Sequence, residues 1–328
     1  MLYLKNPSQD VLSEYCGKIK TKIKKVIASQ DQQIKNVFTE LKLEELIKGT
    51  PDDLIILNDN IMGSLIPNFN GAEYKIFLDC KDKIKLSDEQ KIIKSKYIIV
   101  KDLYRIFNYD NFISKSKSLS YFLATKLNSN TCTYCNRLYT NTVIVKDKKT
   151  KRFNDQGRIT RPQFDHWFVK SKYPILALSF YNLIPSCYVC NSSIKGDAEF
   201  DLKNHIHPYV KENKESFKFS FDSLNIDENN VKIIVKKGSK MDNTLKEFKI
   251  KEVYNSHSMF ELKDLIELRK KYSDNYLDVL FNQTFSVGIT EKEIYRLVFG
   301  VEPEEKDYHK RPFSKFKKDI VNELLKIN

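Results

Sequence analysis

The residues whose types and spacing could do chemistry lie close together in the chain. The segment QFDHWFVKSKYP places Asp165 directly before His166, one of only five histidines in 328 residues. Two asparagines follow, Asn182 in SFYNLIPSC and Asn191 in CNSSIKG. An acid, an imidazole and two amides in this order offer a proton acceptor and hard oxygen ligands, which phosphodiester hydrolysis uses.

Four of the six cysteines form two Cys-x-x-Cys pairs that flank this segment: Cys132 and Cys135, then Cys187 and Cys190. Two such pairs in a cytosolic chain predict a four-thiolate structural Zn²⁺ site, because each tight turn supplies two ligands. A redox-active pair is the alternative. One pair would suffice for that chemistry, and neither precedes a clear helix of a βαβ unit. We expect Cys16 and Cys80 to be small buried side chains.

The Asp-His, Asn, Asn series, framed by both cysteine pairs, resembles the HNH (ββα-metal) nuclease superfamily in its zinc-knuckle branch. The resemblance covers residues 132–196. More widely, CTYCNR, RPQFDHWFVKSKYPILALSFYNLIPSCYVCNSSIKG and HIHPY are similar to the HNH nucleases of bacterial anti-phage systems, such as the PtuB subunit of Septu-type defence. The later YRLVFG and HKRPFSKFKKDI look like the tail of longer proteins of this kind.

The resemblance implies a role for each polar residue of the series. His166 would be the general base, and Asp165 and Asn191 would be ligands of a catalytic Mg²⁺ or Mn²⁺. Asn182 would bridge the loop backbone and hold His166 in register. Many HNH members carry His at the position of Asn191. Taken alone, His166 would be read as a surface or core histidine at a strand end, and only its setting favours catalysis.

Basic and aromatic residues around the series offer contacts to nucleic acid. Four of them could bind phosphates, although each could equally be a solvated charge: Arg161, Lys170, Lys172 and Lys195. We expect Trp167 and Phe168 to pack in the core. His205 and His207 in HIHPY would share one side of a strand, where they could add a metal or phosphate contact or tie the module to the C-terminal region.

The charge of the chain is uneven. The net charge is +13, and residues 126–200 carry 12 Lys and Arg against 5 Asp and Glu. A local basic surface favours a polyanionic partner, most often nucleic acid, although a Lys-rich soluble surface accounts for the charge as well. The chain has no apolar run of 18 residues and no signal-peptide pattern, so we expect a cytoplasmic protein without a membrane partner.

The elements that must position these residues predict an α+β fold in three regions. Residues 1–125 would be a helical domain, with helices over 9–27, 32–48 (ending at Gly49), 87–108 and 117–127 and a less regular stretch over 50–75. Residues 126–210 would be the central ββα-metal module with its zinc knuckles, with strands near 138–146 and 158–165 joined by a polar turn.

Residues 211–328 would hold a small sheet and then helices. Alternation in SFKFSF, VKIIVKK and EFKIKEVY predicts antiparallel strands. Ser258 with Glu261, and Thr290 with Glu293, predict capping boxes, the second helix ending at Gly300. A last helix is expected over about 313–326.

Together with the resemblance, these observations predict a metal-dependent endonuclease that cleaves DNA rather than RNA. The resemblance places it in anti-phage defence. An RNase aimed at a particular RNA such as tRNA, and a zinc-knuckle protein that binds nucleic acid or a partner without cutting, are the alternatives. The resemblance also implies an ATPase partner of the ABC/SMC type. This chain has no GxxxxGK[ST] loop, so ATP-driven control would come from the partner.

Overall fold

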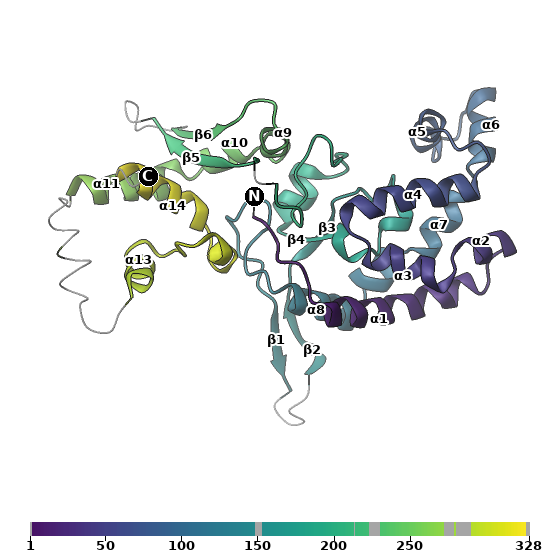
Figure 1. Ribbon diagram of the computed structural model, residues 1–328, viewed down its shortest axis with the longest axis horizontal. Coiled ribbons are helices and arrows are strands. Elements are labelled where there is room, and N and C mark those ends of the chain that lie inside the picture. Colours follow the sequence, from purple (N-terminus) through teal and green to yellow (C-terminus); the bar gives the residue numbers. More distant parts are fainter. Residues whose placement is uncertain are drawn as a thin grey trace.

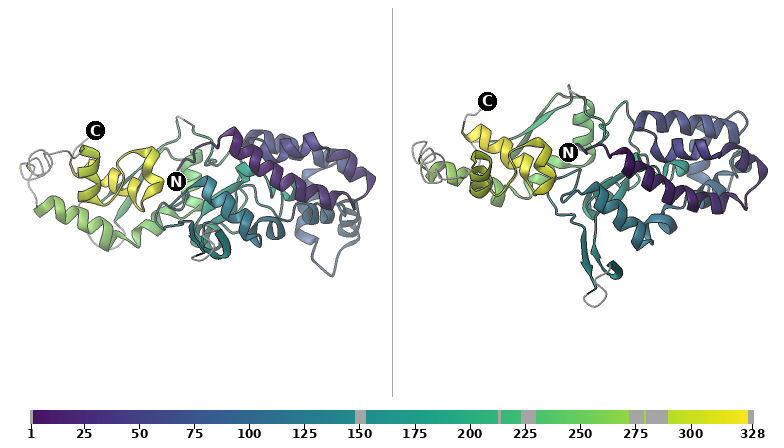
Figure 2. Two further views of the ribbon diagram at one scale, coloured as in Figure 1. Left: turned by 90° about the horizontal axis from the view of Figure 1, so that it is seen from below. Right: turned by 60° about the horizontal axis from the view of Figure 1, so that its bottom comes forward.

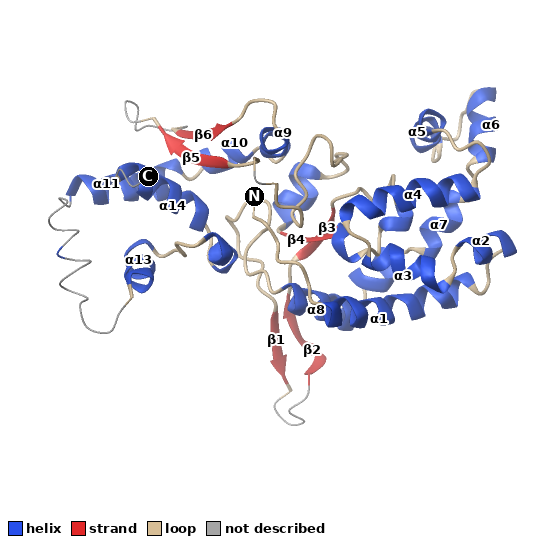
Figure 3. Cartoon of the chain, viewed as in Figure 1, coloured by secondary structure: helices blue, strands red, loops and turns tan. Residues whose placement is uncertain are grey.

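A computed structural model describes residues 2–147, 153–212, 214–222, 230–271, 279 and 290–325. Helices dominate, and the strands of the described residues form three separate two-stranded antiparallel sheets (Figures 1 and 3). The α+β class predicted from the sequence is therefore confirmed. None of the helices in the described ranges is long and apolar enough to cross a bilayer.

The N-terminal region consists of helices on one side of the molecule (Figure 1). They are α1 (Gln9–Ile27), α2 (Gln32–Val37), α3 (Glu40–Lys48), α4 (Pro51–Leu65), α5 (Gly71–Cys80), α6 (Asp88–Lys96), α7 (Val100–Ile106), the π-helical turn η1 (Asp110–Ser114) and α8 (Lys117–Leu127). The apolar side chains of α1 form a buried stripe along the helix, with Tyr15, Ile19 and Ile23 fully covered. Ser8 begins this helix by accepting a hydrogen bond from the Val11 amide.

Three predictions in this region need correction. The helix expected over 32–48 is two helices, because Phe38 leaves the helical conformation and the Thr39 hydroxyl caps α3. The helix expected over 87–108 is likewise divided into α6 and α7. The stretch 50–75 is mostly helical. There, Thr50 and Asp53 form a capping box around Pro51, and the Asn70 side chain accepts from two amides of α5.

The central region contains two hairpins. β1 (Val143–Lys146) pairs with β2 (Phe153–Thr160) in an arm that projects from the body (Figures 1 and 2). β3 (Gln163–His166) pairs with β4 (Leu183–Ser186), and the π-helical segment η4 (Val189–Lys195) follows. Two single-turn 3₁₀ segments, η2 (Pro174–Leu176) and η3 (Phe180–Asn182), fill the connection from β3 to β4. Part of the predicted turn, 148–152, lies outside the described residues.

The C-terminal region pairs β5 (Phe217–Phe221) with β6 (Val231–Val235), as two of the alternating segments predicted. Its helical elements are α9 (Lys240–Glu247), α10 (Ile250–Asn255), η5 (Ser258–Leu262), α11 (Lys263–Lys271), α13 (Glu291–Phe299), η7 (Glu305–Lys310) and α14 (Ser314–Leu324). The predicted helix over 313–326 corresponds to α14, and 326–328 lie outside the described residues.

Of the other predictions for this region, one is confirmed and two are wrong. The Thr290–Glu293 box and the left-handed Gly300 (φ +69°) bound α13 as predicted. The strand predicted for EFKIKEVY is wrong, because α9 and α10 meet there at a left-handed Lys249. The capping box predicted at Ser258 is also wrong, since its hydroxyl donates to the Asn255 carbonyl.

The three predicted regions share one hydrophobic core. Buried side chains from 1–125, 126–210 and 211–328 belong to a single cluster, with Tyr15, Trp167 and Phe316 as fully covered members from each. Cys16 and Cys80 are both buried in the helical region, as expected. Both the N-terminal and the C-terminal regions therefore contribute to the core around the β3–β4 hairpin.

Candidate active site and candidate metal centre

The four paired cysteines come together as predicted. The Sγ atoms of Cys132, Cys135, Cys187 and Cys190 all lie within 4.8 Å of one another, and all four residues are buried. Tetrahedral Zn–S bonds of about 2.3 Å place sulfurs about 3.8 Å apart, so this cluster fits a four-thiolate zinc ion. The amides of Arg137 and Cys190 each lie 3.4 Å from a cysteine sulfur, which suits thiolates.

The first knuckle, 132–135, is held by segments distant in sequence. The Thr133 amide and hydroxyl both donate to the Pro185 carbonyl in β4, at 3.2 and 2.7 Å. Asn136, in the left-handed conformation (φ +49°), donates through its side chain to the Tyr308 and Arg311 carbonyls at 2.9 and 3.2 Å. Its own carbonyl accepts from the Phe313 amide at 2.7 Å. The first knuckle thus joins the β3–β4 hairpin to the C-terminal region.

His166 stands at the end of β3, opposite Leu183 in β4. Its side chain is nearly buried, and Nε2 lies 3.0 Å from the Ala177 carbonyl oxygen. A carbonyl only accepts, so Nε2 carries the proton and Nδ1 keeps a lone pair in the neutral ring. Burial lowers the pKa of His166 to about 3, and the Lys170 ammonium acts in the same direction. The ring is therefore neutral at pH 7.

The loop that supplies Ala177 is fixed from within and from the helical region. The Asn182 side chain accepts from the Phe168 amide at 2.6 Å and donates to the Phe168 and Leu176 carbonyls at 3.0 and 2.9 Å. From the helices, Tyr15 donates to the Leu178 carbonyl at 2.9 Å. Asn182 therefore bridges the backbone of this loop. From the helical region, the ring of Tyr109 meets the ring of His166 edge-on, with the ring centroids 4.4 Å apart.

Asp165 is buried beside His166, and both of its carboxylate oxygens have partners. Tyr134 donates to Oδ2 at 2.6 Å, and the Lys195 ammonium lies 3.2 Å from Oδ1. Burial raises the pKa of the Asp165 carboxyl, and Lys195 and then Tyr134 oppose that rise. A carboxylate has about four lone-pair sites, so Tyr134 and Lys195 alone do not fill all of them.

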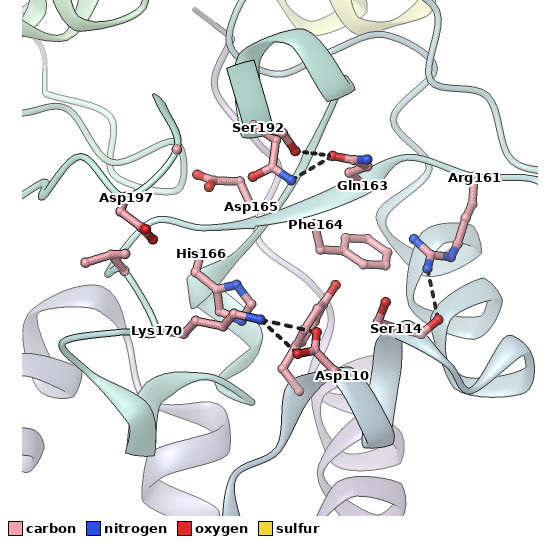
Figure 4. Close-up of a pocket in the computed structure, with 14 residues that line it drawn as sticks. Asp110, Ser114, Arg161, Gln163, Phe164, Asp165, His166, Lys170, Ser192 and Asp197 are labelled. Atoms are coloured by element: carbon pink, nitrogen blue, oxygen red, sulfur yellow. Dashed lines mark hydrogen bonds and ion pairs between the residues drawn. The ribbon is translucent and has the colours of Figure 1, made fainter. Parts of the chain in front are cut away.

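Asn191 lies on η4, and its amide nitrogen donates to the Gln163 side-chain oxygen at 2.8 Å. It lines, with Asp165 and His166, an open cavity of about 420 Å³ (Figure 4). Within the described ranges only the cysteines form a cluster of three or more His, Cys, Asp or Glu ligands. One carboxylate with amide oxygens suits Mg²⁺ or Mn²⁺, which keep waters and bind substrate phosphates.

The predicted phosphate ligands separate into two groups. Arg161 and Lys170 line the cavity, and Lys170 pairs with Asp110 at 3.2 Å. Lys172 lies outside the cavity lining and pairs with Glu199. Lys195 is buried, and it donates to the His166 carbonyl at 2.9 Å besides its pair with Asp165. The prediction of a phosphate contact for Lys195 is corrected, because a covered ammonium of an internal ion pair cannot meet a substrate.

The two histidines of HIHPY do not lie on a strand, which corrects that expectation. His207 is buried against Trp167, with ring centroids 4.6 Å apart, and His205 stacks on Phe200 at 4.4 Å. Between them, the Ile206 amide donates to Thr244 of α9 at 2.9 Å. These contacts match the alternative interpretation, in which HIHPY ties the central module to the C-terminal region. Trp167 and Phe168 are core residues, as expected.

Sequence reasoning missed four contributors to the site. Tyr109 and Asp110 reach it from the helical region, and Gln163 orients Asn191. Tyr134 lies inside the first Cys-x-x-Cys pair, and that position was the one available signal. The others carried no motif, because their role arises from packing between distant segments.

No protein-family model, no curated protein and no solved structure matches this chain. The likeness to HNH nucleases therefore rests on the sequence motifs alone.

Proposed function

We propose that the chain is a metal-dependent endonuclease of the HNH (ββα-metal) kind, with DNA as its substrate. One observation carries the proposal. The order β3, β4, η4 brings a neutral histidine, a carboxylate and an asparagine to one open cavity beside a four-cysteine cluster. The residue types gathered there are those that the resemblance implies, and this supports the proposal.

In this proposal His166 accepts a proton from water at Nδ1, because the Ala177 carbonyl keeps the other proton on Nε2. The water oxygen then forms a bond to phosphorus, the bond from phosphorus to the leaving deoxyribose oxygen breaks, and that oxygen takes a proton from solvent. A Mg²⁺ or Mn²⁺ held by Asp165 and Asn191 would neutralise charge on the phosphate and the leaving oxygen. Arg161 and Lys170 line the cavity as phosphate contacts.

The cysteine cluster holds Zn²⁺ in this proposal and has no part in the chemical step. It fixes the junction between β4 and η4, because Cys187 and Cys190 lie where β4 passes into η4. The low pKa of His166 makes it a weak base without substrate. Binding of a phosphate to Lys170 would remove one cause of that low pKa.

The biological setting of the proposal rests on the resemblance alone. It assigns the nuclease to bacterial anti-phage defence, under the control of an ABC/SMC-type ATPase. The helical region offers exposed apolar side chains for such a partner, among them Ile84, Ile92 and Ile98. A neighbouring ATPase in the genome is the observation to seek first.

The deciding experiment is a cleavage assay on plasmid DNA and total RNA with Mg²⁺ or Mn²⁺. It compares the wild-type chain, His166→Ala and the control His309→Ala, with and without the product of the adjacent gene. His309 is half-buried and outside the cavity, so its loss should leave activity intact. Cutting by wild type and control alone supports the proposal, and the nucleic acid that is cut identifies the substrate.

The opposite result has one clear meaning. If no protein cuts either nucleic acid, with zinc bound and the adjacent product present, the enzyme proposal is wrong. The remaining candidate is then a zinc-knuckle protein that binds without cutting. The occupied oxygens of Asp165 favour that candidate as the second choice, because Lys195 already supplies a cation there.

A further inference from the structure

A second cavity adjoins the candidate active site. It has a volume of about 330 Å³ and includes Lys81, Tyr104 and Ala177 in its lining. Four residues line both cavities and so mark the boundary between them: Tyr109, Asp110, Lys170 and Asp197. We call the two adjoining cavities together the groove; its first part is lined by His166, and both parts are lined partly by residues of the helical region.

Three cationic side chains line this groove, and they differ in whether a carboxylate neutralises them. Arg161 lines the first cavity and Lys81 the second, and neither has an acidic partner among the ion pairs of the described residues. Each is held in place without a carboxylate. Arg161 donates to the Pro162 and Ser114 carbonyls, and Lys81 donates to the Tyr104 hydroxyl at 3.0 Å. Such cations are oriented yet not neutralised, which suits anionic ligands.

The middle cation, Lys170, is neutralised by Asp110. Both side chains of this pair are about half exposed, 45% and 59%, and Figure 4 shows the pair beside His166. An exposed ion pair contributes little to stability, so Lys170 can exchange Asp110 for a phosphate at small cost. Asp197 also lines the groove. With Asp165 neutralised by Lys195, three cations face two carboxylates.

We infer that the groove binds one strand of the nucleic acid through successive phosphates, with Lys81 holding a phosphate beyond the scissile one. Lys170 leaves Asp110 when the strand enters. This inference rests on the proposed function and adds a second binding subsite to it. A polyanionic strand fits three spaced cations on one path better than a single small anion does.

The test is a binding measurement that needs no cleavage. Zinc-loaded protein carrying His166→Ala is titrated, without added Mg²⁺ or Mn²⁺, against fluorescent single-stranded and duplex DNA, with RNA as a further arm. Lys81→Met keeps the aliphatic stem over Tyr104 and removes the charge. Lys101→Met on neighbouring α7 is the matched control, because Lys101 is exposed and lines neither cavity.

Binding by Lys81→Met should be several-fold weaker, and its salt dependence should fall by about one counterion. Lys101→Met should bind as wild type does. Asp110→Asn should tighten binding several-fold, the opposite sign, because it frees Lys170. Oligonucleotides too short to span both cavities should lose the difference between Lys81→Met and wild type.

Equal losses in Lys81→Met and Lys101→Met, or no loss in either, would overturn the groove and indicate diffuse charge attraction. Weaker binding by Asp110→Asn would overturn the exchange at Lys170. The cleavage assay separates this outcome from the fate of the proposed function. A Lys81→Met chain without His166→Ala that cuts DNA with unchanged KM and kcat would sink the subsite and leave the nuclease intact.

Discussion

The phenol of Tyr134 donates a hydrogen bond to Asp165 Oδ2 at 2.6 Å, deep inside the protein. Tyr134 lies between Cys132 and Cys135, and its ring stacks on Phe248 at 4.0 Å. The zinc knuckle and the candidate metal-binding carboxylate are therefore in direct contact. Zinc binding should set the position of Asp165 through this one side chain.

Replacement of Tyr134 by Phe tests that contact. The ring and its packing remain, and only the hydroxyl is lost, so zinc content should stay at one per chain. The loss of a hydrogen-bond partner of a metal ligand typically weakens metal binding or activity by roughly 10–100-fold. Titration of Mn²⁺ into zinc-loaded protein by calorimetry should show weaker binding. Tyr139→Phe, at an exposed tyrosine near the knuckle, should bind Mn²⁺ as wild type does.

Substitution of one cysteine of the cluster should destabilise the fold more than substitution of a buried cysteine elsewhere. Cys190→Ser should abolish zinc binding and lower the free energy of unfolding by at least about 4 kcal/mol, because the site joins distant segments. Cys80→Ser, at an equally buried cysteine outside the cluster, should keep its zinc. Metal analysis with thermal unfolding measures both. Full zinc retention by Cys190→Ser would contradict the four-cysteine site.

The buried ion pair between Lys195 and Asp165 makes a third prediction. Lys195→Met leaves a covered carboxylate without its cation, and breaking such a pair costs roughly 3–5 kcal/mol. The double variant Lys195→Met with Asp165→Asn should recover much of that loss, since neither charge remains. Urea unfolding of the four proteins completes the cycle. If the two changes are simply additive, the groups do not interact.

His207 should make the protein less stable in mild acid. Burial lowers its pKa to about 3, against about 6.5 for an unfolded histidine. As pH falls below 6.5, the unfolded chain takes up a proton that the folded chain refuses. Stability is therefore present above pH 6.5 and declines towards pH 3, by up to about 1.4 kcal/mol per pH unit.

His207→Asn is the variant that isolates this effect. Its side-chain oxygen can replace Nδ1, which accepts from the Tyr209 amide at 3.2 Å, and it does not titrate. Unfolding at pH 7.5, 6.5 and 5.5 with excess zinc should show a shallower decline for the variant. His166 titrates in both proteins, so the difference between the two curves reports on His207. Parallel curves would show that the buried imidazole is not the cause.

The sequence predicted the parts of the site that depend on local spacing. Two Cys-x-x-Cys pairs specify the zinc ligands whatever the fold around them, and the stripe of α1 follows from helical periodicity alone. Contacts between distant segments left no such pattern. Tyr109 meets His166 because two regions pack together, and Lys195 is buried as the partner of Asp165, which is distant from it in the sequence.

The errors in secondary structure have a local cause. EFKIKEVY alternates like a strand, yet it spans the end of α9, a left-handed Lys249 and the start of α10. Two short helices joined at such a residue give an alternating pattern by coincidence. In the same way, the polar and Pro-bearing start of α4 was read as an irregular stretch, although Pro51 and Asp53 begin a helix.

The hydrogen bonds between Asn136 and the C-terminal region have a consequence for folding during synthesis of the chain. A ribosome delivers the four cysteines, Asp165 and His166 more than a hundred residues before Tyr308, Arg311 and Phe313 emerge. Until then Asn136, at the end of the first knuckle, lacks its C-terminal backbone partners. A half-made chain therefore carries the four cysteines, Asp165 and His166 before residues 308–313 exist to bind Asn136, so the first knuckle is completed only late in synthesis.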